Sequence, residues 1–521
     1  MKSLYKVISL LIALCIALTG CSQSYKYEQK LNIIEDNYRT YYEVFVYSFY
    51  DSNGDGIGDI KGLTSKLDYI KDLGFNGIWL MPIMPSTTYH KYDVIDYYNI
   101  DSQYGSLNDF KELIKECNKR SIKVIIDLVI NHTSTKNEWF QSAVNSLAEG
   151  KQNKYTNYYN FSETKNSSGK YYPTGTGKGY YEAVFWDQMP DLNLANNELR
   201  KEFENIMKFW LDMGVEGFRI DAAKEFFSGN STKNIEVLKW ITDYCKGYNP
   251  NTYIVAEVWE DFLVMSNYYK SGIDSLFNFS YSQAKGKIAS TINLKGEANT
   301  AKEYAKSVID TYNKIQSINE NAIDAPFLSN HDTARSIGFF AGDDKKDKMA
   351  LGINLLMNGT PFVYYGEEIG MVGSGKDENK RAPMRWSDTN SKGITTGPPN
   401  METQDKSFPA VDIQLKDKNS ILNYVKRAVR IRNENPEIAR GVPTYLNIVD
   451  DDDICAIKKT YKNNEIVIIY NTSEQHKSLK LAQSEMKEKK IYGYLSTSTK
   501  DIVEFKNATL SLPPYSIVIL K

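Results

Sequence analysis

Charged side chains close several of the apolar runs in this sequence, and chemistry is expected from them. The residues concerned are Asp127, Arg219, Asp221, Glu257 and Asp332. Removing a charged group from water is costly unless a partner or a function compensates for it. A structural ion pair would account for one such run end, but four run ends of this kind predict one shared site.

The few histidines of the chain indicate the same site. The sequence contains four, and three of them, His90, His132 and His331, lie in the segments that end or follow these runs. A single histidine is more often structural than functional, whereas three in one group of segments indicate a common role.

A set of carboxylates without other catalytic motifs indicates acid–base chemistry. The sequence shows no Cys/His metal cluster, no glycine-rich phosphate loop and no serine-elbow motif. Two carboxyl groups, one ionised and one protonated, are the arrangement that cleaves an acetal. Arg219 lies on the same strand face as Asp221 and is expected to keep it charged. Apolar neighbours are expected to raise the pKa of Glu257, namely Val255, Ala256, Val258 and Trp259.

A scaffold must bring these run ends together. Eight apolar runs recur, each followed by a helix-like stretch: 44–47, 77–81, 124–128, 217–221, 253–257, 275–279, 326–330 and 361–365. Near-continuous apolar runs are typical of strands that are buried on both faces. Strand–helix units in this number predict an α/β protein with a (β/α)8 TIM barrel, in which functional residues lie at the C-terminal ends of the strands.

The spacing of the runs predicts the domain boundaries. The barrel domain is expected over residues 37–440, with an inserted subdomain after the third strand at about 133–195, where the sequence is rich in Tyr, Asn and Gly. The last barrel helix is expected near 419–434. Residues 441–521 contain a hairpin signature around Lys462-Asn463-Asn464 and predict a C-terminal all-β sandwich.

The N-terminus is expected to direct secretion. Lys2 and Lys6 precede an apolar stretch that is too short for a membrane span, so residues 1–20 predict a signal peptide. Leu18-Thr19-Gly20-Cys21 resembles the lipobox of bacterial lipoproteins, which implies lipidation of Cys21, a tether over 21–36 and an extracytoplasmic, membrane-anchored protein at the cell surface. The formal net charge of -2 gives no indication of a nucleic-acid partner.

Four segments resemble the signature regions of the α-amylase family of glycoside hydrolases, also called family 13. They are Asp127-Leu128-Val129-Ile130-Asn131-His132, Gly217-Phe218-Arg219-Ile220-Asp221-Ala222-Ala223-Lys224, Glu257-Val258-Trp259 and Phe327-Leu328-Ser329-Asn330-His331-Asp332. The resemblance implies that Asp221 is the nucleophile, Glu257 the general acid/base and Asp332 the stabiliser of the transition state. It also implies substrate contacts from Tyr92, His132, Arg219, Lys224, His331, Arg335 and Arg381.

The resemblance also bears on the subgroup. Met189-Pro190-Asp191-Leu192-Asn193 resembles the fifth region of the neopullulanase-like and intermediate α-amylase branches. Tyr89 stands where the oligo-1,6-glucosidase branch tends to carry an Asp that helps to close the pocket, which favours internal cleavage. The segment from Arg381 to Trp386 resembles the oligo-glucosidase side instead, so the subgroup stays open.

Asp51-Ser52-Asn53-Gly54-Asp55-Gly56-Ile57-Gly58-Asp59 is a candidate metal loop. Oxygen ligands at alternate positions suit a hard cation such as Ca²⁺. Gly62 occupies the place of the closing Glu of an EF-hand, so the loop is not of that type. It resembles a metal loop of the α-amylase family, which implies a structural Ca²⁺ held by Asp51, Asn53, Asp55, the Ile57 carbonyl and Asp59.

Three functions remain open at this point. The first is an α-amylase that cleaves α-1,4 bonds inside starch-like glucans and maltooligosaccharides with retention of configuration. The second is an α-glucosidase, a neopullulanase or cyclomaltodextrinase, or a transglycosylase on the same scaffold. The third is a non-catalytic glycan-binding lipoprotein, which the presence of Asp221, Glu257 and Asp332 disfavours.

Overall fold

The computed structural model describes residues 36–166, 170–293, 299–481, 486 and 489–521. The predicted signal peptide, Cys21 and the predicted tether up to residue 35 lie outside the described residues. Of the helices that it does describe, none has both the length and the apolar character needed to cross a membrane.

Eight parallel strands form the central sheet in the order β10-β9-β8-β7-β3-β2-β1-β11. Their bounds are β1 Tyr41–Val44, β2 Gly77–Leu80, β3 Lys123–Leu128, β7 Gly217–Ile220, β8 Tyr253–Ala256, β9 Ser275–Phe277, β10 Ile323–Ala325 and β11 Phe362–Tyr364. A parallel bridge between Phe327 and Phe362 joins the β10 side to β11, so the sheet nearly closes into a barrel. The predicted (β/α)8 fold is confirmed.

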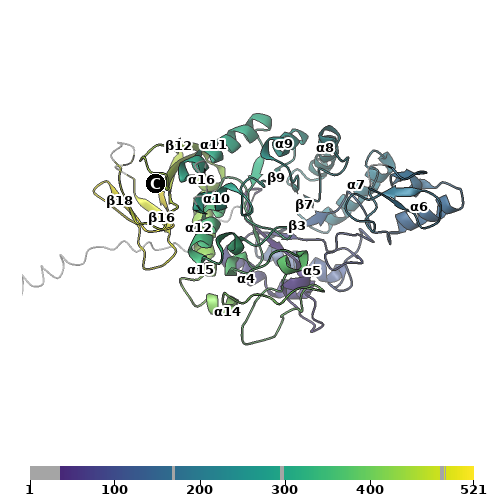
Figure 1. Cartoon of the computed structure of the whole chain (residues 1–521), viewed down its shortest axis with the longest axis horizontal. Helices are drawn as coiled ribbons and strands as arrows, with labels where there is room; N and C mark the ends of the chain where they lie inside the picture. Colours follow the sequence, from purple (N-terminus) through teal and green to yellow (C-terminus); the bar gives the residue numbers. More distant parts are fainter. Residues whose placement is uncertain (1–35, 167–169, 294–298, 482–485, 487–488) are drawn as a thin grey trace, which may run out of the picture. The chain divides into compact units, whose positions relative to one another are not determined.

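Helices cover the outside of the sheet (Figure 1). They are α3 Ile60–Ser65, α4 Leu67–Leu73, α5 Leu107–Lys119, α7 Asn197–Asp212, α8 Ser231–Tyr248, α10 Lys287–Asn293, α11 Ala301–Ile318, α12 Asp344–Leu355, α15 Ile421–Glu434 and α16 Pro436–Arg440. In α5, residues at helical spacing are buried (Phe110, Leu113, Ile114 and Cys117), and Ser106 begins the helix with a capping box to Asp109. One polar face and one apolar face thus explain why this segment forms a helix that packs on the strands.

Shorter elements lie in the connections. They are α2 Val46–Phe49, α9 Phe262–Ser266, α13 Asp377–Lys380, α14 Val411–Gln414, η1 Lys154–Asn157, η2 Asn267–Ser271, η3 Ser336–Phe340 and η4 Glu367–Ile369. The barrel interior is filled by side chains, several of them aromatic, including Tyr41, Trp79, Tyr253, Phe277 and Phe362. The interior is therefore a packed core, and polar groups that act on a substrate must lie at the strand ends.

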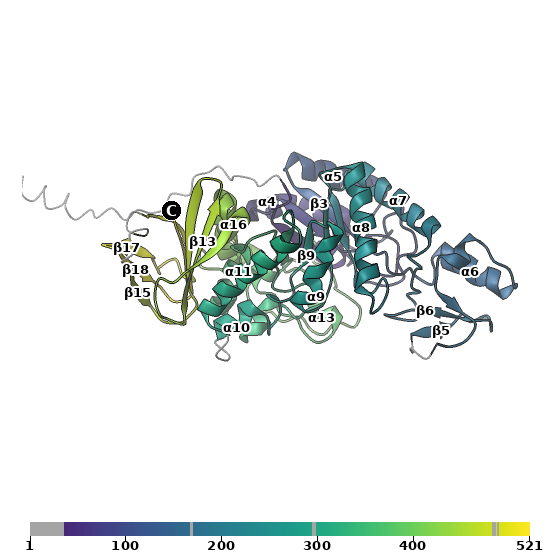
Figure 2. The ribbon, with the colours of Figure 1, turned by 90° about the horizontal axis from the view of Figure 1, so that it is seen from above.

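The segment between β3 and β7 forms the predicted insertion. It contains α6 Glu138–Ala148 and a small antiparallel sheet of β4 Phe161–Ser162, β5 Tyr171–Pro173 and β6 Tyr180–Glu182 (Figure 2). Phe140 packs edge-on against Tyr159 and Tyr181, which joins the helix to the sheet.

The C-terminal region is all-β, as predicted. One sheet contains β12 Val442–Leu446, β13 Ile454–Tyr461, β14 Asn464–Asn471, β19 Ser516–Leu520 and β16 Ile491–Leu495, and the other contains β15 Lys477–Lys480, β18 Thr509–Leu512 and β17 Glu504–Lys506. Apolar residues from both sheets, among them Val467, Leu510 and Val518, share one core. The opposite face of the larger sheet packs on the barrel helices, for example through Tyr470 against Tyr304 of α11 (Figure 1).

Two barrel strands lie earlier in the sequence than predicted. The first strand is Tyr41–Val44 rather than 44–47, and the seventh is Ile323–Ala325 rather than 326–330. Both true strands contain a carboxylate, Glu43 or Asp324, which made them less apolar than the residues that follow. The apolar residues that follow the two strands, 45–47 and 326–330, form the connections that leave the barrel.

Candidate active site

The register of the barrel strands brings Asp221 and Glu257 side by side. In the pairing of β7 with β8, Ile220 lies opposite Ala256, and each carboxylate is the next residue along its chain. The N–H of Glu257 donates to the carbonyl of Ile220 at 3.0 Å, and the N–H of Ala223 donates to the carbonyl of Glu257 at 2.9 Å. Main-chain hydrogen bonds therefore fix both residues at the carboxyl end of the barrel.

Arg219 joins three carboxylates. Its guanidinium is fully buried and pairs with Asp127, with Nη1 and Oδ1 2.7 Å apart. The same guanidinium contacts Asp221 and Glu257. Because one positive charge cannot neutralise three negative charges in a buried cluster, we expect one of the three carboxyl groups to retain its proton near neutral pH.

The environment assigns this proton to Glu257. Burial raises the pKa of Glu257 to about 7 in spite of the Arg219 charge beside it. Burial also raises the pKa of Asp127, to about 6. However, Asp127 accepts a further hydrogen bond from the Trp79 indole N–H at 3.0 Å, and such a bond favours the ionised form. Asp221 is then an ionised carboxylate next to a carboxylic acid.

A second polar group contains Asp332. His331 Nε2 lies 3.0 Å from one of its carboxylate oxygens, and Arg381 Nη2 lies 2.8 Å from the other. Burial would raise the pKa of Asp332, but the charges of His331 and Arg381 hold this pKa below its ordinary range. Arg381 also donates to the carbonyl of His331 at 3.2 Å and to the hydroxyl of Tyr89 at 3.1 Å. Asp332 is therefore an oriented, ionised carboxylate.

Tyr92 and His132 complete the centre. The Tyr92 ring stacks on the His331 imidazole, with ring centroids 5.6 Å apart and an interplanar angle of 15°. Nε2 of His132 lies 3.2 Å from the carbonyl oxygen of Tyr92. Burial lowers the pKa of His132, so this side chain is a neutral imidazole whose Nε2–H donates to that carbonyl.

This geometry is that of a carboxylate-dependent hydrolase, and the similarity to known proteins is in the same region. The family profile described as "Alpha amylase, catalytic domain" matches residues 43–441. The chain belongs to the α-amylase family. It is therefore a glycoside hydrolase, as the carboxylates and the signature regions predicted.

Similar proteins of the α-amylase family extend over most of the chain. "Alpha-amylase 3" of Dictyoglomus thermophilum is 39% identical over 485 residues, which cover 92% of either chain. An oligo-1,6-glucosidase of Parageobacillus thermoglucosidasius is 29% identical, over 83% of this chain and 90% of that one. Among solved structures, Eubacterium rectale Amy13B has a TM-score of 0.90 and 45% identity, and the match covers 94% of this chain and 97% of that one.

Two predicted substrate contacts of this α-amylase family member lie away from the central cluster. Lys224 is about one-third exposed at the rim, with Nζ 3.2 Å from Glu260. Arg335 is 1% exposed, and its guanidinium donates to the main-chain carbonyls of Lys380 at 3.0 Å and Tyr365 at 2.7 Å. The structure thus places Arg335 behind the centre, where it supports the segment that carries Arg381.

Two residues of the centre, Glu43 and Trp79, were not among the predicted site residues. Glu43, in β1, contacts His331, while Trp79 and Asp127 surround Arg219. Asp127 is one of the charged run ends from which chemistry is expected, but the resemblance assigns it no individual role. A signal for Glu43 was present, because a glutamate between aromatic and β-branched residues in a buried strand requires a partner.

The backbone is strained directly after Asp221. Ala222 has φ of 45°, which is in the left-handed region that residues with a Cβ rarely adopt. Such strain is found at functional sites, where the surrounding structure enforces it. Here the hydrogen bond from Ala223 to Glu257 holds the turn in place.

The predicted metal loop has oxygen donors of the right kind, but they are engaged with the loop itself. Asp51 accepts from the backbone N–H of Gly54 at 2.6 Å and of Gly56 at 2.7 Å, and Asp59 accepts from the N–H of Gly62 at 2.7 Å. Asp55 is exposed and accepts from the N–H of Ile57 at 2.8 Å. Within the described ranges, no three acidic, histidine or cysteine side chains converge closely enough to hold a metal ion.

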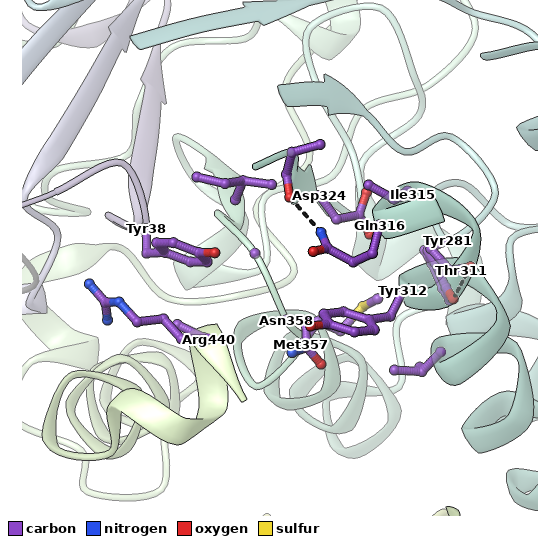
Figure 3. A pocket seen from close by; sticks show the side chains of 15 residues that line it. Tyr38, Tyr281, Thr311, Tyr312, Ile315, Gln316, Asp324, Met357, Asn358 and Arg440 are labelled. Carbon is purple, nitrogen blue, oxygen red and sulfur yellow. Dashed lines mark hydrogen bonds between the residues drawn. The ribbon is translucent and has the colours of Figure 1, made fainter. Parts of the chain in front are cut away.

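A separate, partly open pocket lies near the opposite end of the barrel (Figure 3). Its lining includes Tyr38, which precedes β1, and Asn358, which precedes β11, together with Tyr312, Asp324 and Arg440. Burial raises the pKa of Asp324 to about 7, and both of its oxygens lie 3.1 Å from Nδ2 of Asn278. The paired carboxylates lie instead at the other strand ends, so the active centre is assigned there.

Proposed function

We propose that this protein is an α-amylase that hydrolyses internal α-1,4-glucosidic bonds of starch-like glucans and maltooligosaccharides with retention of configuration. The observation that carries the proposal is the contact of one guanidinium, that of Arg219, with both Asp221 and Glu257. It keeps the two carboxyl groups close together. Retaining pairs are about 5–5.5 Å apart, whereas inverting pairs need about 6.5–9.5 Å for an additional water.

The environments of the two groups support the division of roles. Asp221, ionised beside Arg219, attacks the anomeric carbon and forms a covalent glycosyl intermediate. Glu257 gives its proton to the leaving oxygen, and as a carboxylate it then takes a proton from the water that attacks the intermediate. Asp332 is aligned by His331 and Arg381 to accept hydrogen bonds from sugar hydroxyls as positive charge develops on the ring.

The endo character rests on Tyr89. This residue stands where the oligo-1,6-glucosidase branch tends to have an acid, and its hydroxyl accepts from Arg381 at 3.1 Å. Arg381 is thereby held between Tyr89 and Asp332. It is not paired with an acid at position 89 that would close the pocket around the end of a glucan chain. An exo-acting α-glucosidase is the alternative, and the identity with an oligo-1,6-glucosidase supports it. The Met189–Asn193 segment favours the intermediate α-amylase branch.

The product profile from amylose, pullulan, cyclodextrin and maltose tests this function. We expect a mixture of maltooligosaccharides early in amylose digestion, and α-anomers by NMR before mutarotation. Glucose as the only early product would show that the activity is that of an α-glucosidase and not of an α-amylase. Initial β-anomers would exclude the retaining mechanism.

We also propose that the loop from Asp51 to Asp59 binds one Ca²⁺ for stability. Its oxygen donors at alternating positions support this, and so does the exposure of Asp55. The carboxylates would exchange their hydrogen bonds to loop amides for the ion, while the Ile57 carbonyl would add a neutral oxygen.

Calcium removal should destabilise the protein. Since an ion at 100 times its Kd adds about 2.7 kcal/mol, a chelator should lower the Tm of a chain of this size by about 3 °C. Asp55→Ala should lower Tm to a similar value and abolish the response to the chelator, whereas Asp243→Ala, on the exposed face of α8, should retain it. If the chelator leaves the Tm of the wild type and of Asp243→Ala unchanged, the loop is not a structural metal site.

We further infer that the protein is secreted and anchored to the bacterial membrane by a lipid on Cys21. The lipobox-like Leu18–Cys21 segment supports this. The wild-type chain should partition into the membrane fraction, and Cys21→Ser should remove the lipid-modified mass and the membrane association. Unchanged membrane association of Cys21→Ser would contradict the anchor.

A further inference from the structure

A buried carboxylate with no part in bond cleavage faces the back of the active centre. Glu43 lies in β1 and is 1% exposed, and its Oε1 is 2.6 Å from Nδ1 of His331. The strand places it opposite Trp79 of β2 and Tyr364 of β11, which leaves its side chain in the barrel interior. Burial raises the pKa of Glu43, so this position costs free energy unless the contact has a purpose.

The hydrogen-bond partners of His331 determine its protonation state. Nδ1 faces Glu43, while Nε2 lies 3.0 Å from an oxygen of Asp332 and 2.7 Å from the hydroxyl of Tyr92. A carboxylate accepts hydrogen bonds but does not donate them, so a hydrogen on each ring nitrogen suits both carboxylates. A neutral imidazole has only one N–H and would direct a lone pair at one of the carboxylates. With a carboxylate beside each ring nitrogen, the arrangement favours the imidazolium form, and the Tyr92 hydroxyl can then accept from Nε2–H.

We propose that Glu43 is a positioning residue that keeps His331 doubly protonated, so that its Nε2–H stays directed at Asp332 and at the bound sugar. This rests on the role of Asp332 in the proposed function. Without the Glu43 charge, the pKa of His331 would be lower, and above that pKa the ring would be neutral. The single remaining N–H could then be on Nδ1 instead of Nε2. Asp332 would then face a lone pair and lose its orientation.

Other charged or titratable groups surround His331 from every side. They are Tyr92 after β2, Asp127 of β3, Arg219 of β7, Glu257 after β8, Asp332 after β10 and Arg381 near α13. Arg219 and Arg381 oppose a charge on the imidazole, and Tyr92 is neutral. Glu43 and Asp332 are the two carboxylates in direct contact, and together they raise the pKa of His331 to about 10 although burial would lower it.

The first test is the titration of His331 itself, without substrate. The chain has only four histidines, so the imidazole ¹⁵N spectrum of the full-length protein is simple, and His331→Asn assigns the signal. We expect His331 to remain doubly protonated at pH 8 in the wild type. In Glu43→Gln its pKa should fall by about 1–3 pH units, the usual effect of removing an adjacent opposite charge. A neutral His331 at pH 7 in the wild type overturns the proposal, and this result does not depend on how Glu43→Gln folds.

Kinetics give the second test. If the pKa of His331 falls to about 7, kcat of Glu43→Gln relative to wild type should be about tenfold lower at pH 8 and nearly unchanged at pH 5.5. Glu368→Gln is the matched control, because Glu368 is also a fully buried glutamate, and it accepts at 2.6 Å from Tyr69 and from Tyr42, the residue before Glu43 in β1. Its activity ratio should not depend on pH.

The outcomes separate this inference from the proposed function. A pH-independent loss in Glu43→Gln, with unchanged His331 titration, means that Glu43 only supports packing. A shifted titration with no change in the kinetic ratio means that the charge of His331 does not matter for catalysis, which also overturns the proposal. An altered product profile would contradict the α-amylase activity but leaves the titration result standing.

Discussion

Asp221→Asn is expected to lower kcat on starch by about 10⁴-fold or more, the scale seen when a covalent nucleophile is removed. The amide is nearly isosteric with the carboxylate, and it can still accept a hydrogen bond from Arg219, so the strand end should keep its shape. Maltooligosaccharide affinity should therefore change little. Calorimetric titration together with single-turnover kinetics measures both effects.

The control for this prediction is a buried carboxylate outside the centre. Asp324→Asn alters β10 at the side that lines the pocket in Figure 3, and it should leave kcat within a few-fold of wild type. If Asp221→Asn retained more than about one per cent of wild-type turnover, Asp221 would not be the nucleophile.

Glu257→Gln should have an effect that depends on the leaving group. On starch, loss of the acid should lower kcat by about 10²–10⁴-fold. On a nitrophenyl glycoside, whose leaving group needs little protonation, the first step should be far less impaired. The covalent intermediate should then accumulate, because its hydrolysis still requires Glu257 as a base. Mass spectrometry of the quenched protein detects this species.

The acid role also fixes the sign of the pH dependence. Because Glu257 must be protonated in the first step, wild-type kcat/KM should decline as pH rises through about 7, the pKa to which burial raises this group. The first step of Glu257→Gln on the nitrophenyl substrate should not show this decline.

Azide identifies the two carboxylates separately. In Glu257→Ala it should intercept the β-linked intermediate and give an α-glycosyl azide. In Asp221→Ala it should attack the α-linked substrate directly and give the β-azide. The opposite pairing of variants and products would mean that nucleophile and acid are assigned the wrong way round.

The barrel and most of the active centre could be predicted from the sequence, because the same segments show both the apolar run of a buried strand and the carboxylate that ends it. Asp221 and Glu257 each end an apolar run, and parallel strands bring such ends to one edge. The hairpin around Lys462-Asn463-Asn464 and the last strand, Ser516–Leu520, were also recognisable, because alternation and a turn signal are local properties.

Features that depend on distant partners were not predictable in this way. Glu43 is meaningful only beside His331, which is 288 residues away in the sequence. Arg335 comes soon after the fourth signature region in the sequence. The direction of its side chain is decided by the carbonyls of Tyr365 and Lys380, which belong to other segments. The predicted first and seventh strands begin too late in the sequence, because hydrophobicity indicates where an apolar run lies. The bounds of a strand are decided by its pairing with the neighbouring strands.

The closure of the barrel between its first and last strands determines when the protein can become active. Tyr41 of β1 pairs with Phe362 of β11, and Glu43 of β1 contacts His331, which follows β10. At about 5–20 residues per second, the ribosome needs roughly 15–60 s to make the intervening chain. During this time β1 has no neighbour on one side, and for most of it Asp332 has not yet been synthesised. A nascent chain is therefore without activity and carries an exposed strand edge, which makes it dependent on protection from aggregation until its last barrel strand has been made.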